Sequence, residues 1–120
     1  MAGKAKYLMI ASMDVDPEHE AIFNEVYDQE HVPYLSQVPG VLSIKRCERQ
    51  ELVMNIGGER KTIRIANEPK YTAIYELESP EVLTSAAWDR AVEKGRWPTQ
   101  VRPYTRNRRH VLLKITDPEL

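Results

Sequence analysis

The sequence predicts an α+β fold of the ferredoxin-like type, in which two β-α-β halves form one antiparallel sheet with both helices on one face. Short apolar runs and segments of helical periodicity alternate in the order β-α-β-hairpin-β-α-β. The chain has 120 residues, which is enough for one hydrophobic core but not for two. We therefore expect residues 1–120 to form a single ferredoxin-like domain.

The first predicted strand is the continuous apolar run Tyr7–Met13, which is too short for a helix and is typical of a strand buried on both faces. Asp16 and Pro17 then form a helix-start signal, with an N-cap carboxylate and a proline at the first helical position. Pro33 disfavours a helical conformation at the residue before it, so we expect this helix to end near His31.

The second predicted strand is Val41–Cys47, in which polar and apolar residues alternate moderately. Two further short strands follow, Glu51–Ile56 and Glu59–Ile65, and the glycine pair Gly57 and Gly58 joins them. Two strands separated by two glycines predict a β-hairpin. We expect this Glu51–Ile65 hairpin to be an addition to the basic fold that reshapes the mouth of any pocket.

The second β-α-β half repeats the pattern, beginning with the predicted strand Tyr71–Leu77. Ser79 and Pro80 repeat the helix-start signal, and the helical spacing of apolar residues continues until Gly95. A last strand, about residues 106–115, has a polar first half and an apolar second half.

Helices can cover only one face of such a sheet, yet Tyr7–Ala11 and Val111–Leu113 are apolar at consecutive positions. Both faces of the sheet therefore need cover, and a monomer would expose a large apolar patch. We expect a symmetric homodimer in which the two sheets pack face to face.

Net charge, the length of apolar runs and cysteine content indicate which partners and which cellular compartment to expect. The formal net charge is −1, so no net field recruits nucleic acid or a membrane surface. No apolar run approaches the roughly 18–20 residues of a transmembrane helix. The single cysteine, Cys47, suits a reducing compartment and is expected to be a small buried side chain, so we expect a cytoplasmic protein.

Charge is unevenly distributed along the chain. The segment between Arg90 and His110 contains six arginines and a single acid. Most of these arginines are expected to screen the acidic segment between Asp14 and Glu30. One or two of them could instead bind an anionic ligand, because the guanidinium fork matches a carboxylate.

His31 is the first candidate for chemistry. It follows Tyr27 by four residues, and Glu30 follows Val26 by four, so both extend the apolar stripe of the helix toward the sheet. An imidazole transfers protons near neutral pH, and a carboxylate from Asp28 or Glu30 would orient it. The alternative is a histidine that only ends the helix and favours the negative end of its dipole.

Two stretches, Phe23–Pro33 and Val38–Arg46, resemble the EthD-like families of dimeric α/β-barrel proteins, in which a D-E-H-x-P helix precedes a V-P-G strand ending in arginine. This resemblance implies a ferredoxin-like fold that dimerises through its sheets, usually without a metal or an organic cofactor. Relatives include isomerases, cyclases, lyases, cofactor-free monooxygenases and accessory proteins of catabolic operons.

The resemblance also implies roles for individual residues. It makes His31 a general acid or base and Arg46 a ligand for a substrate carboxylate or enolate. Tyr75 and Trp88 would line the pocket, although Trp88 also fits a simple core position.

Metal and RNA sites are not expected. The three histidines, His19, His31 and His110, lie in separate elements without the spacing of a zinc site. The aromatic strand signature of RNA-binding ferredoxin-like modules is missing as well.

The sequence therefore predicts a cofactor-free isomerase that moves a proton on a small unsaturated oxo-carboxylate, such as a ring-cleavage product of aromatic-compound catabolism. His31 would shuttle the proton, while Arg46, with Arg108 or Arg109, would hold the carboxylate and stabilise the dienolate. The alternatives are a non-catalytic dimer that binds a small molecule and a cofactor-free monooxygenase of a phenolic substrate.

Overall fold

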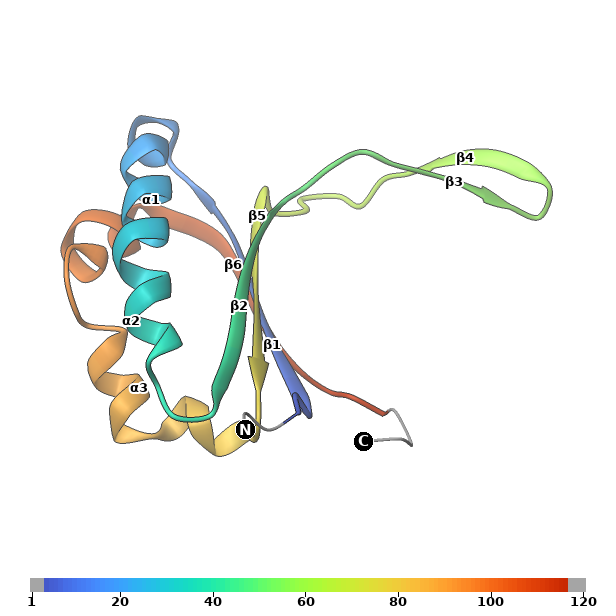
Figure 1. Ribbon diagram of the computed structural model, residues 1–120. Coiled ribbons are helices and arrows are strands. Elements are labelled where there is room, and N and C mark those ends of the chain that lie inside the picture. Colours follow the sequence, from blue (N-terminus) through green and yellow to red (C-terminus); the bar gives the residue numbers. More distant parts are fainter. Residues whose placement is uncertain (1–3, 117–120) are drawn as a thin grey trace.

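A computed structural model describes residues 4–116 and shows an α+β chain with a layer of helices on one face of an antiparallel sheet (Figure 1). The strands are β1 Tyr7–Val15, β2 Val41–Glu48, β3 Leu52–Ile56, β4 Glu59–Ile63, β5 Tyr71–Leu77 and β6 Thr105–Lys114. The helical segments are η1 Pro17–His19, α1 Glu20–Val26, η2 Tyr27–His31, α2 Val32–Ser36, η3 Pro80–Thr84, α3 Ala86–Ala91, η4 Trp97–Val101 and η5 Arg102–Tyr104.

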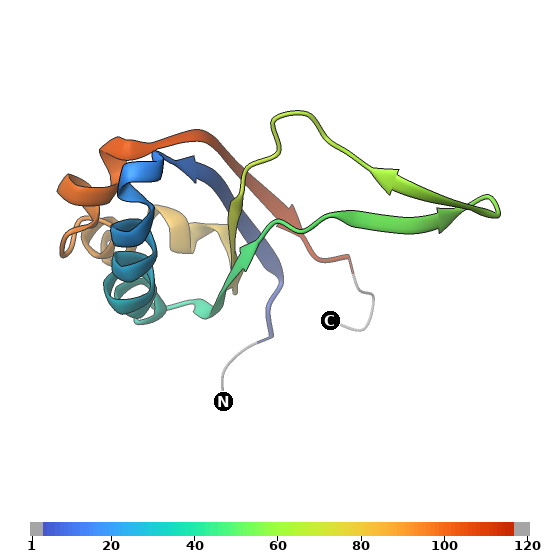
Figure 2. The ribbon, with the colours of Figure 1, turned by 90° about the horizontal axis from the view of Figure 1, so that it is seen from above.

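The main sheet has the strand order β2-β5-β1-β6, and all its neighbouring strands are antiparallel. This confirms the predicted antiparallel sheet with an added hairpin. All helices lie on the same side of the sheet, which Figure 2 shows from above. Within residues 4–116, no helix is long and apolar enough to cross a membrane.

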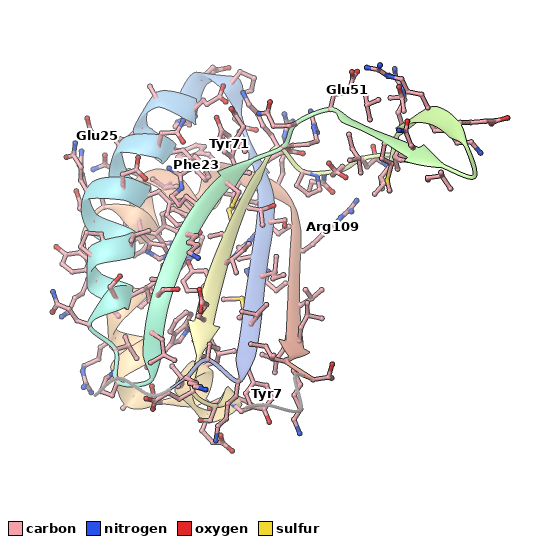
Figure 3. All side chains as sticks on the ribbon, turned by 45° about the vertical axis from the view of Figure 1, so that its right-hand side comes forward. Tyr7, Phe23, Glu25, Glu51, Tyr71 and Arg109 are labelled. Atoms are coloured by element: carbon pink, nitrogen blue, oxygen red, sulfur yellow. The ribbon has the colours of Figure 1, made fainter. Side chains whose placement is uncertain are left out.

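The core lies between the helices and the sheet. Alternate residues of β1 and β5 are buried beneath the helices, as the period of two in a strand requires. Phe23 from the helix layer and Tyr71 from the sheet meet between the two layers, whereas Arg109 points outward from the other face (Figure 3). We call that other face, which bears no helix, the open face. The prediction that β1 is buried on both faces is wrong for the single chain, because Leu8 and Ile10 on the open face are partly exposed.

The first helical segment runs without a break from Pro17 to Ser36, so the prediction that it ends near His31 is wrong. The reason is a π-helical turn, η2, in which the backbone N–H of Val32 donates to the carbonyl of Tyr27, five residues back. In a regular α-helix, Pro33 would lack the N–H that bonds the carbonyl four residues earlier, and its ring would clash with that carbonyl. The wider turn accommodates the proline, and such turns often occur at functional sites.

The second helical segment also differs from its prediction. Ser79 and Pro80 begin only a 3-10 helix, and the α-helix begins at Ala86. Ser85 separates the two because its backbone is extended and its Oγ accepts from the Trp88 backbone N–H at 3.1 Å. The N-cap that starts α3 is therefore Ser85.

The predicted hairpin is present as β3 and β4, and its connection is Gly57-Gly58, with φ values of 61° and 82°. Positive φ at both residues defines the type I′ turn that matches the twist of paired strands. We call residues 51–65 the arm, because this segment projects from the sheet on the side of the open face (Figures 1 and 2).

Candidate functional site

A cavity of about 360 Å³ lies between the helix layer and the sheet, within the size range of small-molecule sites. The first helical segment, α3, strands β1, β5 and β6 and the segment around Trp97 all contribute to its walls. No residue of the arm lines it, so the expected effect of the hairpin on the pocket mouth is not seen in the single chain. A larger hollow of about 620 Å³ lies at the base of the arm, but mostly exposed side chains line it.

His31 lies in the wall of this cavity and is only 5% exposed. Its ring stacks on Trp97 at a centroid distance of 3.9 Å and meets the edge of Tyr27 at 5.2 Å. The Nδ1 atom is buried and has no hydrogen-bond partner among the described residues. Two causes lower the pKa of His31 from its ordinary 6.5 to about 3. The larger cause is burial, and the smaller is the positive charge of Arg102. The imidazole is therefore neutral at physiological pH.

A pair of buried tyrosines lies beside His31. The hydroxyls of Tyr27 and Tyr75 are 3.2 Å apart, and each is the other's hydrogen-bond partner. Burial raises the pKa of both phenols, so they remain protonated donors. Trp88 meets Tyr75 edge-on at 5.7 Å. The structure thus brings together His31, Tyr75 and Trp88 in the same cavity.

Strand β6 supplies basic side chains to the mouth of the cavity. His110 lies opposite Ala11 in the register, so His110 and Arg108 share the helix-covered face and line the cavity. Both are exposed, which places them at the opening. Arg109 belongs to the open face, where it donates to the carbonyl oxygen of Asn67 at 2.8 Å. Of the two arginines predicted on this strand, only Arg108 reaches the site.

The two predicted carboxylates do not contact His31. Asp28 accepts from Arg46 Nη1 at 2.8 Å, and Glu30 accepts from the backbone N–H of Arg96 at 2.8 Å. Glu30 also binds the Arg96 Nε, and these bonds, the backbone bond first, lower the pKa of Glu30. Each carboxylate is therefore occupied by an arginine.

The contact between Glu30 and Arg96 has a structural consequence for the site. Arg96 directly precedes Trp97, the residue that stacks on His31. Gly95, with a φ of 69°, permits the close approach, since a Cβ there would collide with Glu30 Oε1. Glu30 thus positions Trp97 over His31.

Arg46 does not line the cavity, although it contacts Tyr27, which does. Its guanidinium stands 4.5 Å from the centre of the Tyr27 ring and donates to Asn24 Oδ1 at 2.8 Å. It lines a separate shallow hollow with Tyr71 and Cys47. The expectation that Cys47 is buried is wrong, because it lies near the end of the edge strand β2 and is exposed.

Among the polar and aromatic residues of the cavity, four were not identified as site residues from the sequence: Tyr27, Trp97, Arg102 and His110. The alternation of β6 would have placed His110 on the same face as Arg108, but Trp97 and Arg102 lie in irregular helical turns without periodicity. Among residues 4–116, no three side chains of His, Cys, Asp or Glu cluster in a way that could hold a metal ion.

No protein-family model matches this sequence, and no curated protein sequence matches it.

Proposed function

We propose that this chain is a cofactor-independent isomerase that transfers a proton on a small unsaturated oxo-carboxylate, within aromatic-compound catabolism. The observation that carries this proposal is His31, a buried neutral imidazole that lines a cavity and whose Nδ1 has no partner among the described residues. A neutral imidazole can accept a proton from one carbon and return it to another. Such a transfer moves one C–H bond and one double bond within the substrate, so no atoms are gained or lost.

A bound carboxylate would raise the low pKa of His31. Burial and the charge of Arg102 cause the low value, and a carboxylate bound beside Arg102 would offset the second cause. His31 would therefore be a stronger base when substrate is bound than when it is absent.

The other groups supply binding and charge stabilisation. Within the pair of Tyr27 and Tyr75, one hydroxyl donates to the other. The accepting hydroxyl keeps its own hydrogen, which can be donated to an oxo group, where negative charge grows as the dienolate forms. Arg108 at the opening would hold the carboxylate, because the guanidinium of Arg102 in the wall is already paired with Glu93 at 3.0 Å. In this proposal Arg108 takes the part that the sequence predicted for Arg46.

We further propose a ferredoxin-like, EthD-like domain that forms a homodimer through its open face. The strand order β2-β5-β1-β6, with helices on one side, supports the fold assignment. On the open face, Ile10 lies opposite both Ile74 and Val111, and Leu8 lies opposite Leu113. This contiguous apolar patch supports a face-to-face pair.

The test is proton exchange in D₂O, followed by proton NMR, with a panel of short-chain unsaturated oxo-carboxylates. We expect one member to lose its acidic C–H signal and to form an isomer. His31→Gln should slow this by about 10²–10⁴-fold, whereas the matched His19→Gln should leave it unchanged. Equal rates for wild type and His31→Gln would overturn the proposal.

A non-catalytic dimer that binds a small molecule is the second candidate. The observation that favours it is that no carboxylate of residues 4–116 contacts His31, since Asp28 and Glu30 are both paired with arginines. This candidate predicts tight binding of a panel member without isotope exchange, and near-normal binding by His31→Gln. Oxygen consumption with a phenol would instead indicate the cofactor-free monooxygenase.

A further inference from the structure

Strand β6 contains one extra residue where it passes the cavity. Arg109 lies opposite Ser12 of β1. Three residues earlier in β6, Arg106 lies opposite Asp14, which is only two residues from Ser12. Two adjacent residues of β6 therefore face a single residue of β1, which defines a β-bulge. The first of the two, Asn107, has a φ of 52°, in the left-handed region that asparagine enters more readily than most residues.

The side chain of Asn107 ties the bulge to two neighbouring segments. Its Nδ2 donates to Asp14 Oδ2 at 3.0 Å and to the carbonyl oxygen of Asn67 at 2.8 Å. Asp14 also accepts from the backbone N–H of Lys70 at 2.8 Å. The amide thus links β6 both to β1 and to the segment that precedes β5. If β6 were regular from its first residue, Asn107 would point toward the helices and lose both bonds, so these bonds stabilise the bulge.

The bulge decides which basic side chains of β6 face the cavity. At the start of the strand, Thr105 lies opposite Val15, which is buried on the helix-covered face. Strict alternation from Thr105 would turn Arg108 and His110 to the open face. The extra residue reverses this order, so Arg108 and His110 line the cavity. Arg109, which strict alternation would turn to the cavity, points outward from the open face instead (Figure 3).

The second half of β6 does not fix this register by itself. Val111, Leu112 and Leu113 are apolar at consecutive positions, and their exposed fractions are nearly equal, at 48%, 45% and 46%. A shift of one residue turns every side chain of a strand to the other face. Here such a shift would only exchange one half-exposed apolar side chain for another. The register of β6 beside the cavity therefore depends on the bulge.

We propose that Asn107 is a positioning residue, whose bulge sets the register of β6 and thereby presents Arg108 and His110 to the cavity. Asn107 itself does not line the cavity, so it acts through these two residues. The inference rests on the proposed function for the use of Arg108, which would hold the substrate carboxylate. The register itself needs no ligand and can be tested separately.

The experiment is an NMR measurement of cross-strand contacts between β1 and β6 in wild type, Asn107→Gly and Asn107→Val. Glycine adopts a positive φ freely and is disfavoured in a regular strand, whereas β-branched valine disfavours a positive φ. We expect Ser12 to contact Arg109 in wild type and Asn107→Gly, and to contact Arg108 in Asn107→Val. Contact of Ser12 with Arg109 in all three proteins would overturn the proposal. Asn107→Ala takes the place of the valine variant if circular dichroism shows that the latter is unfolded.

A calorimetric titration with the panel of short-chain unsaturated oxo-carboxylates connects the register to the site. Loss of the charge-assisted hydrogen bond from Arg108 should weaken binding by about tenfold or more in Asn107→Val, and by less than about threefold in Asn107→Gly. A shifted register with unchanged affinity would overturn the positioning role. If wild type binds no member of the panel, the proposed function is overturned, and the NMR contacts alone decide whether Asn107 sets the register.

Discussion

The indole ring of Trp97 lies flat against the imidazole ring of His31, with an angle of 11° between the two planes. The two residues are far apart in the chain and are brought together by their neighbours. Glu30, which precedes His31, accepts a hydrogen bond from the backbone N–H of Arg96, which precedes Trp97. A charged contact near the surface thus fixes an aromatic stack in the wall of the cavity.

The contact of Glu30 with Arg96 can be tested by truncation. Glu30→Ala should let Trp97 move away from His31 into a wetter environment, because the backbone N–H of Arg96 loses its acceptor. The measurement is the emission maximum of Trp97 in a Trp88→Phe background, and we expect a shift to longer wavelength. Glu25→Ala is the matched control, since Glu25 contacts only the guanidinium of Arg96 from a half-exposed position. An identical emission maximum in both variants would contradict a positioning role for Glu30.

The low pKa of His31 predicts a particular pH dependence of stability. The unfolded chain binds a proton at His31 near pH 6.5, whereas the folded chain does so only near pH 3. The contribution of His31 to the free energy of unfolding is therefore complete above pH 6.5 and is lost as the pH falls toward 3. Over the whole interval the loss is on the order of 5 kcal/mol.

Urea denaturation between pH 4 and pH 8 measures this dependence. His31→Gln should flatten the acid side of the stability curve relative to wild type, because glutamine does not titrate. If the His31→Gln curve runs parallel to the wild-type curve, His31 does not have the depressed pKa described above.

Substitution of Arg46 should change the stability of the protein, whereas substitution of Arg108 should change its affinity for a ligand. Arg46 binds Asp28 and Asn24 and stands over the Tyr27 ring, so Arg46→Met should reduce stability by about 1–3 kcal/mol with little effect on ligand affinity. Arg108→Met should instead weaken binding of an oxo-carboxylate by about 10–100-fold, as expected for a lost charge-assisted hydrogen bond. Calorimetric titration and urea denaturation of both variants give the two quantities. Loss of affinity in Arg46→Met alone would restore the role that the sequence predicted for Arg46.

The buried hydroxyl pair can be tested by a double-mutant cycle. Tyr27→Phe and Tyr75→Phe should each reduce stability by about 1–3 kcal/mol, since each leaves the remaining hydroxyl buried without its partner. The double variant should lose less than the sum, because no unpaired hydroxyl remains. Urea denaturation measures all four proteins, with Tyr34→Phe as the control. Strict additivity would show that the two hydroxyls do not interact.

The sequence predicted those parts of the fold that depend on local patterns. Two adjacent glycines predicted the hairpin, because positive φ at both positions favours glycine and a type I′ turn requires it. The spacing of Tyr27 and His31 predicted that both side chains face the sheet, and the structure places both in the cavity wall. The π-helical turn was not predictable, since it depends on how the whole segment packs around Pro33.

The sequence by itself determined the antiparallel α+β layout, the hairpin and the burial of His31, because strand and helix periods and turn chemistry are properties of consecutive residues. Only the tertiary structure decided the partners of the charged groups. It assigned Asp28 to Arg46 and Glu30 to Arg96, and it placed Trp97 on His31. Long charged side chains can reach many partners, so their pairing is decided by the distances that packing sets between elements.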